Sequence, residues 1–353
     1  MNFVAGSDIK QKVKMSVNKL LILLTFVVLL RDSLGVYLNC TYKEVVYYPL
    51  SKKLWTCELK NVKYDTGLVS FSHQPKNISS NDGERDYIIT IEKAIKRIKF
   101  VSSSLNTIPN AIFQKFSEVE ILEVFNCGLR DVNGLTLNNA VNLKILLAYD
   151  NKLTTLQDYS LVHVKSLEHL DLSRNRIASI HYHAFNGLEL LKELSLSRNR
   201  ITAIENNIFL PLTNIQWIWL DHNKLTLASV HLFSMANYKL EGVYLNNNNI
   251  SAISPYLFDN LSDLKFLYLN GNHCVNKDFV NFNIANNVNV RKNLNNCYKE
   301  HRNLIPDVEQ QYNIKQLLND VEIDNQKCEE AKESLLESLE TINLNIKSKK
   351  TSN

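Results

Sequence analysis

Aliphatic residues recur along the middle of the chain in a fixed frame, L-x-x-L-x-L-x-x-N-x-L. Leu167, Leu170, Leu172, Asn175 and Ile177 show this frame in full. Its polar member returns every 24 residues, with one step of 25, at Asn151, Asn175, Asn199, Asn223, Asn248 and Asn272. One such unit cannot bury its apolar side alone, so the period predicts a stack of similar units with capped ends.

The frame resembles the leucine-rich repeat, and eight units can be placed over residues 95–274. The units start at Ile95, Val119, Leu143, Leu167, Leu191, Ile215, Leu240 and Leu264. Alternation of apolar and other residues at the start of each unit predicts a short strand. The expected fold is α/β: a curved solenoid with a parallel concave sheet, disulfide caps and a C-terminal helical tail.

The asparagine of each unit is expected to lie in a buried turn. Its side-chain amide can both donate to carbonyl groups and accept from N–H groups of the turn, which would otherwise lack partners. Ser103 and Cys127 occupy the same position in the first two units. Both are small enough to fit there, and we expect Cys127 to be a buried free thiol.

Side chains between the core leucines are expected to point onto the concave face. The central position of each strand carries Lys99, Glu123, Leu147, Asp171, Ser195, Trp219, Tyr244 and Tyr268. Trp217 and Phe266 lie one register over, so Trp217, Trp219, Tyr244, Phe266 and Tyr268 should form one aromatic patch. Exposed Trp and Tyr clusters are typical of binding hot spots. The alternative is that the C-terminal cap or the tail covers the patch.

The N-terminal end carries the features of a secretory signal. Residues 20–30 are a run of eleven apolar or near-apolar residues, preceded by lysines and followed by Ser33 and Gly35. The run is too short to span a bilayer, so residues 1–35 are interpreted as a signal peptide, with Met15 an alternative start. An uncleaved signal anchor is the competing interpretation. No later segment reaches 18 apolar residues.

The charge balance gives no indication of a nucleic-acid partner. The chain has 40 Lys and Arg against 36 Asp and Glu, and residues 1–35 hold five and two of them. The remainder therefore has 35 basic and 34 acidic residues, a net charge of about +1. A nearly neutral protein offers no general basic field.

Six cysteines support export into an oxidising compartment. Cys40 and Cys57 precede the repeats, where an N-terminal cap is needed. Cys274 and Cys297 follow the last repeat asparagine, where a C-terminal cap is needed. Each pair is expected to form a disulfide that closes one end of the solenoid. Cys328 has no obvious partner, which makes it a candidate for a disulfide between two chains.

Four N-x-S/T sequences are candidate glycosylation sites, at Asn39, Asn77, Asn249 and Asn260. Asn249 follows a repeat asparagine and Asn260 lies between Phe258 and Leu261, so both should be accessible. Asn39 adjoins a predicted disulfide and is a poorer acceptor.

The expected organisation is residues 1–35 as signal, 36–94 as N-terminal cap region, 95–274 as repeats, 275–304 as C-terminal cap and 305–353 as a helical tail. The polar stretch 72–86 is expected to be a surface loop. Ile314, Val321, Cys328, Leu335 and Ile342 are spaced by seven residues. That spacing is compatible with a short coiled coil to another chain, or with a lone helix packed on the solenoid.

The sequence contains none of the common catalytic or cofactor motifs: no H-E-x-x-H, G-x-S-x-G, P-loop or dinucleotide fingerprint. His181 and His183 lie in a predicted convex loop without a further ligand group, and His273 is likewise isolated. We therefore expect no enzyme activity, no cofactor and no metal site.

The order of signal, Cys-bearing cap, 24-residue repeats with S-R-N-R-I turns at 173–177 and 197–201, second Cys-bearing cap and Cys-bearing tail resembles the secreted leucine-rich-repeat immune proteins of insects. The resemblance implies a secreted glycoprotein of innate immunity that pairs through its tail by disulfide and coiled coil, as a homo- or hetero-dimer, and binds a protein or glycan. This tail is short and has one Cys, unlike the fuller members. An adhesion protein of the matrix or cell surface, and a soluble ligand in signalling, are the competing hypotheses.

Overall fold

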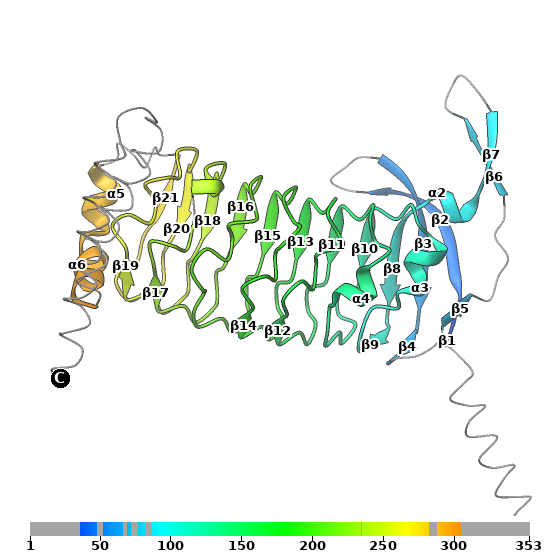
Figure 1. The fold of residues 1–353 in the computed structure, drawn as a ribbon, viewed down its shortest axis with the longest axis horizontal. Helices are drawn as coiled ribbons and strands as arrows, with labels where there is room; N and C mark the ends of the chain where they lie inside the picture. The colour runs from blue at the N-terminus through cyan, green and yellow to red at the C-terminus, as the bar shows by residue number, and fades with distance from the viewer. Residues whose placement is uncertain are drawn as a thin grey trace, which may run out of the picture.

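The computed structural model describes residues 36–47, 52–65, 69–71, 77–81, 86–233, 235–281 and 288–304. Across these residues the chain winds into a leucine-rich-repeat solenoid whose strands lie side by side along its length (Figure 1). The repeat strands are β8 (Ile95–Val101), β10 (Ile121–Glu123), β11 (Ile145–Leu147), β13 (His169–Asp171), β15 (Glu193–Ser195), β16 (Trp217–Trp219), β18 (Gly242–Tyr244) and β20 (Phe266–Tyr268).

All eight repeat strands pair in parallel and in register, so equivalent positions of successive units form straight rows. Five further pieces of strand lie on the return side of the units. They are β9 (Ser104–Leu105), β12 (Thr155–Leu156), β14 (Ser179–Ile180), β17 (Leu227–Ala228) and β19 (Ala252–Ile253). Short helical turns on the same side are α3 (Ala111–Lys115), α4 (Gly134–Leu137) and η1 (Met235–Asn237).

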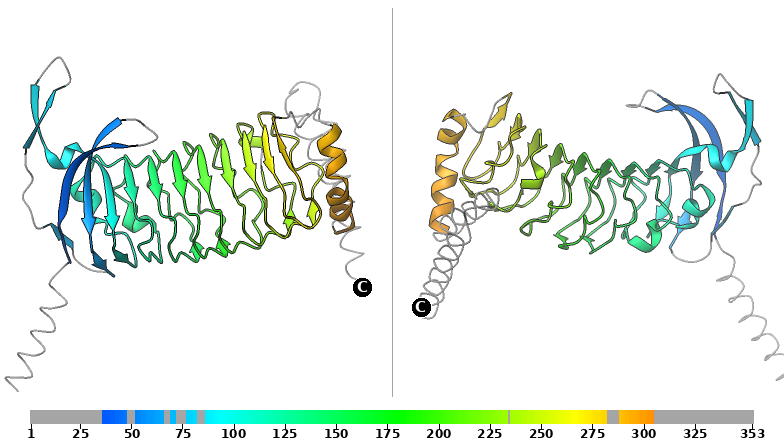
Figure 2. Two further views of the ribbon diagram at one scale, coloured as in Figure 1. Left: turned by 180° about the vertical axis from the view of Figure 1, so that it is seen from behind. Right: turned by 45° about the horizontal axis from the view of Figure 1, so that its top comes forward.

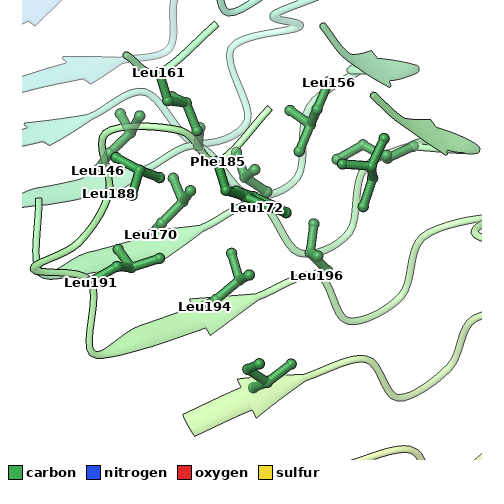
Figure 3. Packing of buried hydrophobic residues seen from close by; sticks show 14 of the residues in the cluster. Leu146, Leu156, Leu161, Leu170, Leu172, Phe185, Leu188, Leu191, Leu194 and Leu196 are labelled. Carbon is green, nitrogen blue, oxygen red and sulfur yellow. The ribbon is translucent and has the colours of Figure 1, made fainter. Parts of the chain in front are cut away.

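The aliphatic residues of the frame fill one continuous core. Leu170, Leu172 and Leu194 are almost completely buried, and Figure 3 shows them facing Phe185 and Leu188 from the return side. The phenylalanines of successive return segments also contact one another, with ring centroids 5.8 Å apart for Phe185 and Phe209. Stacked copies of a single pattern thus bury the apolar surface that one unit would leave exposed.

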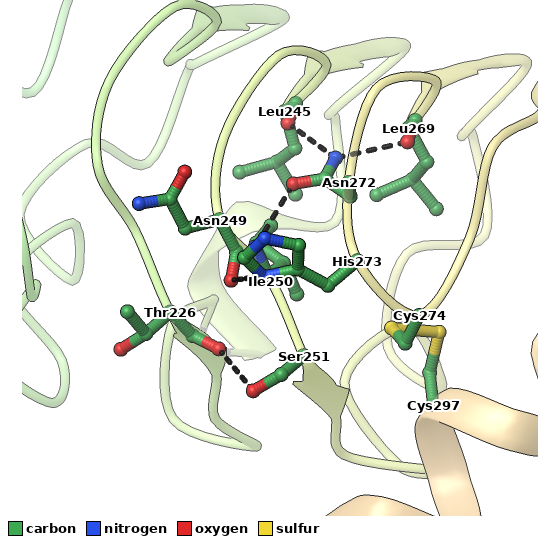
Figure 4. Close-up of a disulfide and its surroundings, with 10 residues drawn as sticks. All are labelled: Thr226, Leu245, Asn249, Ile250, Ser251, Leu269, Asn272, His273, Cys274 and Cys297. Atoms are coloured by element: carbon green, nitrogen blue, oxygen red, sulfur yellow. Dashed lines mark hydrogen bonds between the residues drawn. A yellow bond between two sulfur atoms is a disulfide. The ribbon is translucent and has the colours of Figure 1, made fainter.

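The asparagine ladder forms the hydrogen bonds that its chemistry allows. Asn199 accepts from the N–H of Ile177 at 3.0 Å and donates to the carbonyls of Leu172 and Leu196 at 3.0 Å each. The same pattern is found at Asn151, Asn175, Asn223, Asn248 and Asn272 (for Asn272, Figure 4). Each side chain therefore joins two neighbouring turns and satisfies their buried backbone groups.

The residue before each ladder position has a positive φ, a conformation that asparagine and glycine tolerate best. Only the last of these turns has glycine there, Gly271 at φ +66°. A β-carbon at Gly271 would lie 2.6 Å from Oδ1 of Asn247, so close approach of the preceding turn also selects glycine.

The N-terminal cap adds a turn of the same spiral. Strand β3 (Lys52–Lys60) pairs in parallel with β8, and places Cys57 beside Ile98 in the core row. Ser103 of the first repeat unit connects this cap turn to the repeats. Its hydroxyl accepts from the N–H of Val62 at 3.1 Å, as a ladder asparagine does. The repeat frame cannot be recognised in this turn, because Cys57 stands at a Leu position of the frame and Val62 stands at the Asn position.

Strand β2 (Cys40–Tyr47) is antiparallel to β3 and forms the outer edge of the sheet. The shorter cap strands are β1 (Val36–Leu38), β4 (Lys63–Tyr64) and β5 (Val69–Phe71). Strands β6 (Asn77–Asn81) and β7 (Asp86–Thr90) form an antiparallel hairpin that leads into α2 (Ile91–Ala94). The prediction of a loop over 72–86 was therefore wrong for residues 77–81 and 86, where backbone pairing outweighs the polar composition.

The other end is closed by β21 (Asp278–Val280), α5 (Val288–Asn293) and α6 (Asn295–Leu304). Strand β21 is antiparallel to β20, while α6 packs beside β19 at the end of the core (Figure 2). Cys274 is bonded to Cys297, which attaches α6 to the last turn (Figure 4). Cys40 is bonded to Cys57 between β2 and β3.

Candidate functional site

The first and third residues of each repeat strand face away from the core and form the concave face. In the structure this face has three parts along its length. The N-terminal cap covers the first strands, a hollow follows over β13 and β15, and the aromatic patch lies over β16, β18 and β20. The sequence-based alternative for this face was cover by the C-terminal cap or the tail alone, so the cover at the N-terminal end is a new finding.

Tyr47, at the end of β2, covers the first part of the face. Its side chain packs with Ile121 and Ile145 in a small apolar cluster, separate from the main core, which Leu54 and Leu147 border. Ile121 is 1% exposed and Ile145 is 7% exposed. Apolar residues on the solvent side of a sheet are expected where another segment covers them, and strand β2 of the cap, which ends at Tyr47, is that segment.

A buried ion pair lies under Tyr47 at the end of the same strand, β2. Nε of Arg97 donates to Oε1 of Glu123 at 2.7 Å, and Lys99 lies 3.4 Å from the other carboxylate oxygen. The ring of Tyr47 stacks on the Arg97 guanidinium at 5.0 Å. Burial, followed by the Glu123 carboxylate, raises the pKa of the Tyr47 hydroxyl above its ordinary value. Arg97 and Glu123 are buried beneath Tyr47, so their pair holds the cap in place.

The five residues of the predicted aromatic patch do lie together. Tyr244 stacks on Tyr268 with ring centroids 4.3 Å apart and on Trp219 at 5.6 Å. Trp217 lies 6.0 Å from Trp219 and 5.4 Å from Phe266. All five side chains are partly exposed, and the described part of the C-terminal cap extends the sheet beside them instead of covering them.

Gly242 makes room for this arrangement, and the sequence analysis did not single it out. It lies between Trp217 and Phe266 in the row of first strand positions. A β-carbon at Gly242 would lie 2.2 Å from two carbons of the Trp217 indole, so the ring occupies the space that a side chain would need. Trp217 can therefore reach Phe266 across an intervening strand. A glycine between two aromatics at this register was the signal that could have revealed it.

A hollow of about 410 Å³ lies between the patch and the covered part. Trp219 forms one wall, and Tyr47 with Ile145 and Leu147 lies at the other side. The remaining lining residues are His169, Leu170, Asp171, Glu193 and Ser195. The volume is within the range of sites that bind small molecules or single side chains. The repeat pattern does not predict this hollow, because its far wall comes from Tyr47 in the cap.

Two contacts orient the carboxylates of the hollow. Nδ1 of His169 lies 3.0 Å from Oε2 of Glu193. This hydrogen bond holds the pKa of the Glu193 carboxyl below its ordinary value, so the group is negatively charged at neutral pH. Asp171 accepts from the N–H of Ser173 at 2.9 Å through one oxygen. The floor of the hollow is therefore acidic and preorganised.

The remaining predicted residues are placed as follows. Cys127 is a buried free thiol, and burial raises its pKa to about 11. Asn39 and Asn249 are exposed, and Asn260 is half-buried. Asn77 begins β6. His181, at 3.6 Å from Asp158, and His183, stacked on Tyr159, lie together on the return side. Glycosylation of the four asparagines stays a prediction.

Two predictions lie outside the described residues: the signal at 1–35, and the tail at 305–353 with Cys328. Among the residues that the structure describes, no group of three or more His, Cys, Asp or Glu could hold a metal ion. Within those same ranges, no helix is long and apolar enough to cross a membrane.

The fold defines the class: the described chain is a leucine-rich-repeat solenoid. A family model for the leucine-rich repeat matches residues 166–225 and 220–273, which supports the same superfamily. Proteins of this superfamily generally serve as protein-interaction modules. No curated protein matches the chain.

The chain is similar to parts of several solved structures, including the following two. A leucine-rich-repeat protein of Leptospira interrogans is 22% identical with a TM-score of 0.45, over 51% of this chain and 44% of that one. A TLR13–ssRNA13 complex contains a chain 28% identical with a TM-score of 0.48, over 50% of this chain and 25% of that one. The matched part is therefore less than half the length of either protein.

Proposed function

We propose that this protein is a secreted, non-enzymatic recognition protein that binds a protein or glycan partner through its concave face. The observation that carries the proposal is the aromatic patch, in which five partly exposed rings stack on three neighbouring strands. Rigid aromatic side chains supply a large contact area at a small cost in conformational entropy, which is why they dominate binding hot spots.

The cap supports the same conclusion from the other side. At the N-terminal end of the concave face, Tyr47 of β2 covers the apolar residues Ile121 and Ile145, which are buried. Where the aromatic rings lie, the described chain leaves them accessible. An exposed apolar group of this size is otherwise unfavourable for a monomeric protein.

The extracellular setting is supported by the two disulfides, which persist in oxidising compartments. The apolar segment at residues 20–30 is compatible with export. The resemblance to secreted immune proteins of insects supports a role in innate immunity. Within that role, Cys328 would link two tails, and a non-reducing gel tests this: a Cys328→Ser variant should run as a monomer where the wild type runs as a dimer.

Affinity capture from the extracellular fluid of the source organism tests the binding function. Three immobilised proteins are compared: the wild type, a Trp219→Ala/Tyr244→Ala variant, and a Tyr182→Ala variant that loses an exposed ring on the return side. The proposal expects a partner that the wild type and Tyr182→Ala retain and the double variant loses, with all three secreted equally. A partner retained equally by all three proteins would exclude the aromatic patch as the site.

A further inference from the structure

The hollow beside Trp219 has a chemistry of its own, distinct from the stacked rings of the aromatic patch. Tyr244 covers one face of the Trp219 ring, at a centroid distance of 5.6 Å. The next strand carries Ser195 at the same position, and Ser195 lines the hollow together with Trp219. Trp217 lies against Trp219 from the same strand but does not line the hollow, whereas Trp219 does. Because serine is small, it leaves the indole face opposite Tyr244 accessible from the hollow.

The row continues from Ser195 to Asp171 on the following strand. Strands in a parallel sheet are about 4.8 Å apart, so Trp219 and Asp171 are separated by about 10 Å. A planar cation stacked within about 6 Å of the indole centroid would lie above Ser195. It would then be at hydrogen-bonding distance from the Asp171 carboxylate, whose one oxygen is already oriented by the N–H of Ser173.

The charge of the lining selects a cation for this position. Two carboxylates, Asp171 and Glu193, line the hollow, and His169 is bonded to the second of them. Among the described residues of the lining, none is Lys or Arg. Glu193 is held by His169, but an anion or an apolar group would leave the Asp171 carboxylate without a counter-charge when water is displaced, and desolvation of an unpaired carboxylate is costly.

We propose that the hollow binds an arginine side chain of a partner protein. The guanidinium stacks on the free face of Trp219 and donates hydrogen bonds to Asp171, and its aliphatic stem lies along Leu147. Guanidinium combines a planar face for stacking with a fork of donors for a carboxylate, whereas the ammonium of lysine offers neither. The inference rests on the proposed function and names the partner as a protein.

The probe is a blocked tripeptide, acetyl-Gly-Arg-Gly-amide, with the same peptide carrying citrulline as its neutral isostere. The full-length secreted protein is titrated at low salt while the indole N–H signal of Trp219 is followed by NMR, assigned with a Trp219→Phe variant. We expect saturable shifts at millimolar peptide concentration with arginine and at least a tenfold weaker response with citrulline.

Asp171→Asn is the decisive variant, because asparagine keeps the acceptor for Ser173 and removes the charge. It should weaken the arginine peptide at least fivefold. Glu241→Gln, which alters a carboxylate paired with Lys265 away from the hollow, should leave the affinity unchanged. Equal shifts with arginine and citrulline, or no effect of Asp171→Asn, would overturn the assignment.

A saccharide is the competing occupant, and chitotriose is its probe. Saturable binding of chitotriose that Asp171→Asn abolishes, without binding of the arginine peptide, would also overturn the assignment. The capture experiment distinguishes failure of the arginine site from failure of the proposed recognition function. If Trp219→Ala/Tyr244→Ala loses the partner and Asp171→Asn keeps it, the arginine site fails and the recognition function stands. If all these variants keep the partner, the proposed function fails.

Discussion

The indole of Trp217 occupies the space above Gly242, where a β-carbon would lie 2.2 Å from two ring carbons. Any side chain at this position must displace the ring. We therefore expect Gly242→Ala to separate Trp217 from Trp219 and Phe266, and to lower partner capture at least threefold. The free energy of unfolding of this variant should change by less than about 1 kcal/mol, because Trp217 is partly exposed and can rotate outward.

Near-ultraviolet circular dichroism checks this change, since the two indoles lie 6.0 Å apart with planes inclined by 17°. The signal from the stacked pair should fall in Gly242→Ala and persist in Glu241→Ala, which changes the preceding residue. An unaltered spectrum in Gly242→Ala would show that the patch does not depend on the glycine.

Replacing an asparagine of the ladder should reduce the free energy of unfolding far more than replacing an ordinary surface asparagine. Asn199→Ala removes the partners of one buried N–H and two buried carbonyls. We expect a loss of about 3 kcal/mol, since each buried unsatisfied group costs about 1–3 kcal/mol. Asn139→Ala, on an exposed residue, should change stability by less than about 0.5 kcal/mol. Urea unfolding followed by far-ultraviolet circular dichroism compares them, and similar midpoints would contradict the assignment.

Loss of either partner of the buried Arg97–Glu123 ion pair should lower the free energy of unfolding. Glu123→Gln leaves the buried Arg97 without its counter-charge, which costs about 3–5 kcal/mol. Replacing both residues, in Arg97→Met/Glu123→Leu, should recover most of this loss. The matched control is Glu168→Gln, which breaks the exposed pair with Lys192 and should cost less than about 1 kcal/mol. Thermal unfolding measures all three, and equal effects of Glu123→Gln and Glu168→Gln would show that burial has no role.

Cys127 provides a test by pH. Burial raises its pKa from the ordinary thiol value of 9.0 to about 11, so the folded state holds the proton more strongly than the unfolded chain does. The contribution is complete below pH 9 and is lost as the pH rises from about 9 to about 11. The wild type should therefore lose more stability over this interval than Cys127→Ala.

Alkylation checks the same burial independently. At pH 8, iodoacetamide should modify the Cys127 peptide only after unfolding in urea, as followed by mass spectrometry of that peptide. Rapid modification of the native protein would show that the thiol is accessible and would remove the basis for the raised pKa.

The repeat architecture was predictable because it depends on local chemistry repeated at a constant interval. Each ladder asparagine bonds backbone groups that its own position in the frame determines, as for Asn199 with Leu196 three residues away. The aromatic patch followed from the same register, since equivalent positions must become neighbours in a parallel sheet.

The features that were missed depend on contacts with no fixed interval. Tyr47 reaches Ile145 from a strand nearly one hundred residues earlier, a separation that no repeat period encodes. The hollow exists because that covered part stops before Trp219. Cys57 and Val62 concealed a further turn for a different reason: their side chains fit the core but do not match the repeat frame.

The central claim is that partners contact the aromatic part of the concave face, and site-specific photocrosslinking tests it most directly. Benzoylphenylalanine is placed at Tyr268 on that face, or at Tyr182 on the return side, and each protein is irradiated in the native extracellular fluid. The account predicts a crosslinked partner for the probe at position 268 and none at position 182. A partner crosslinked only from position 182, with none from 268, would contradict it.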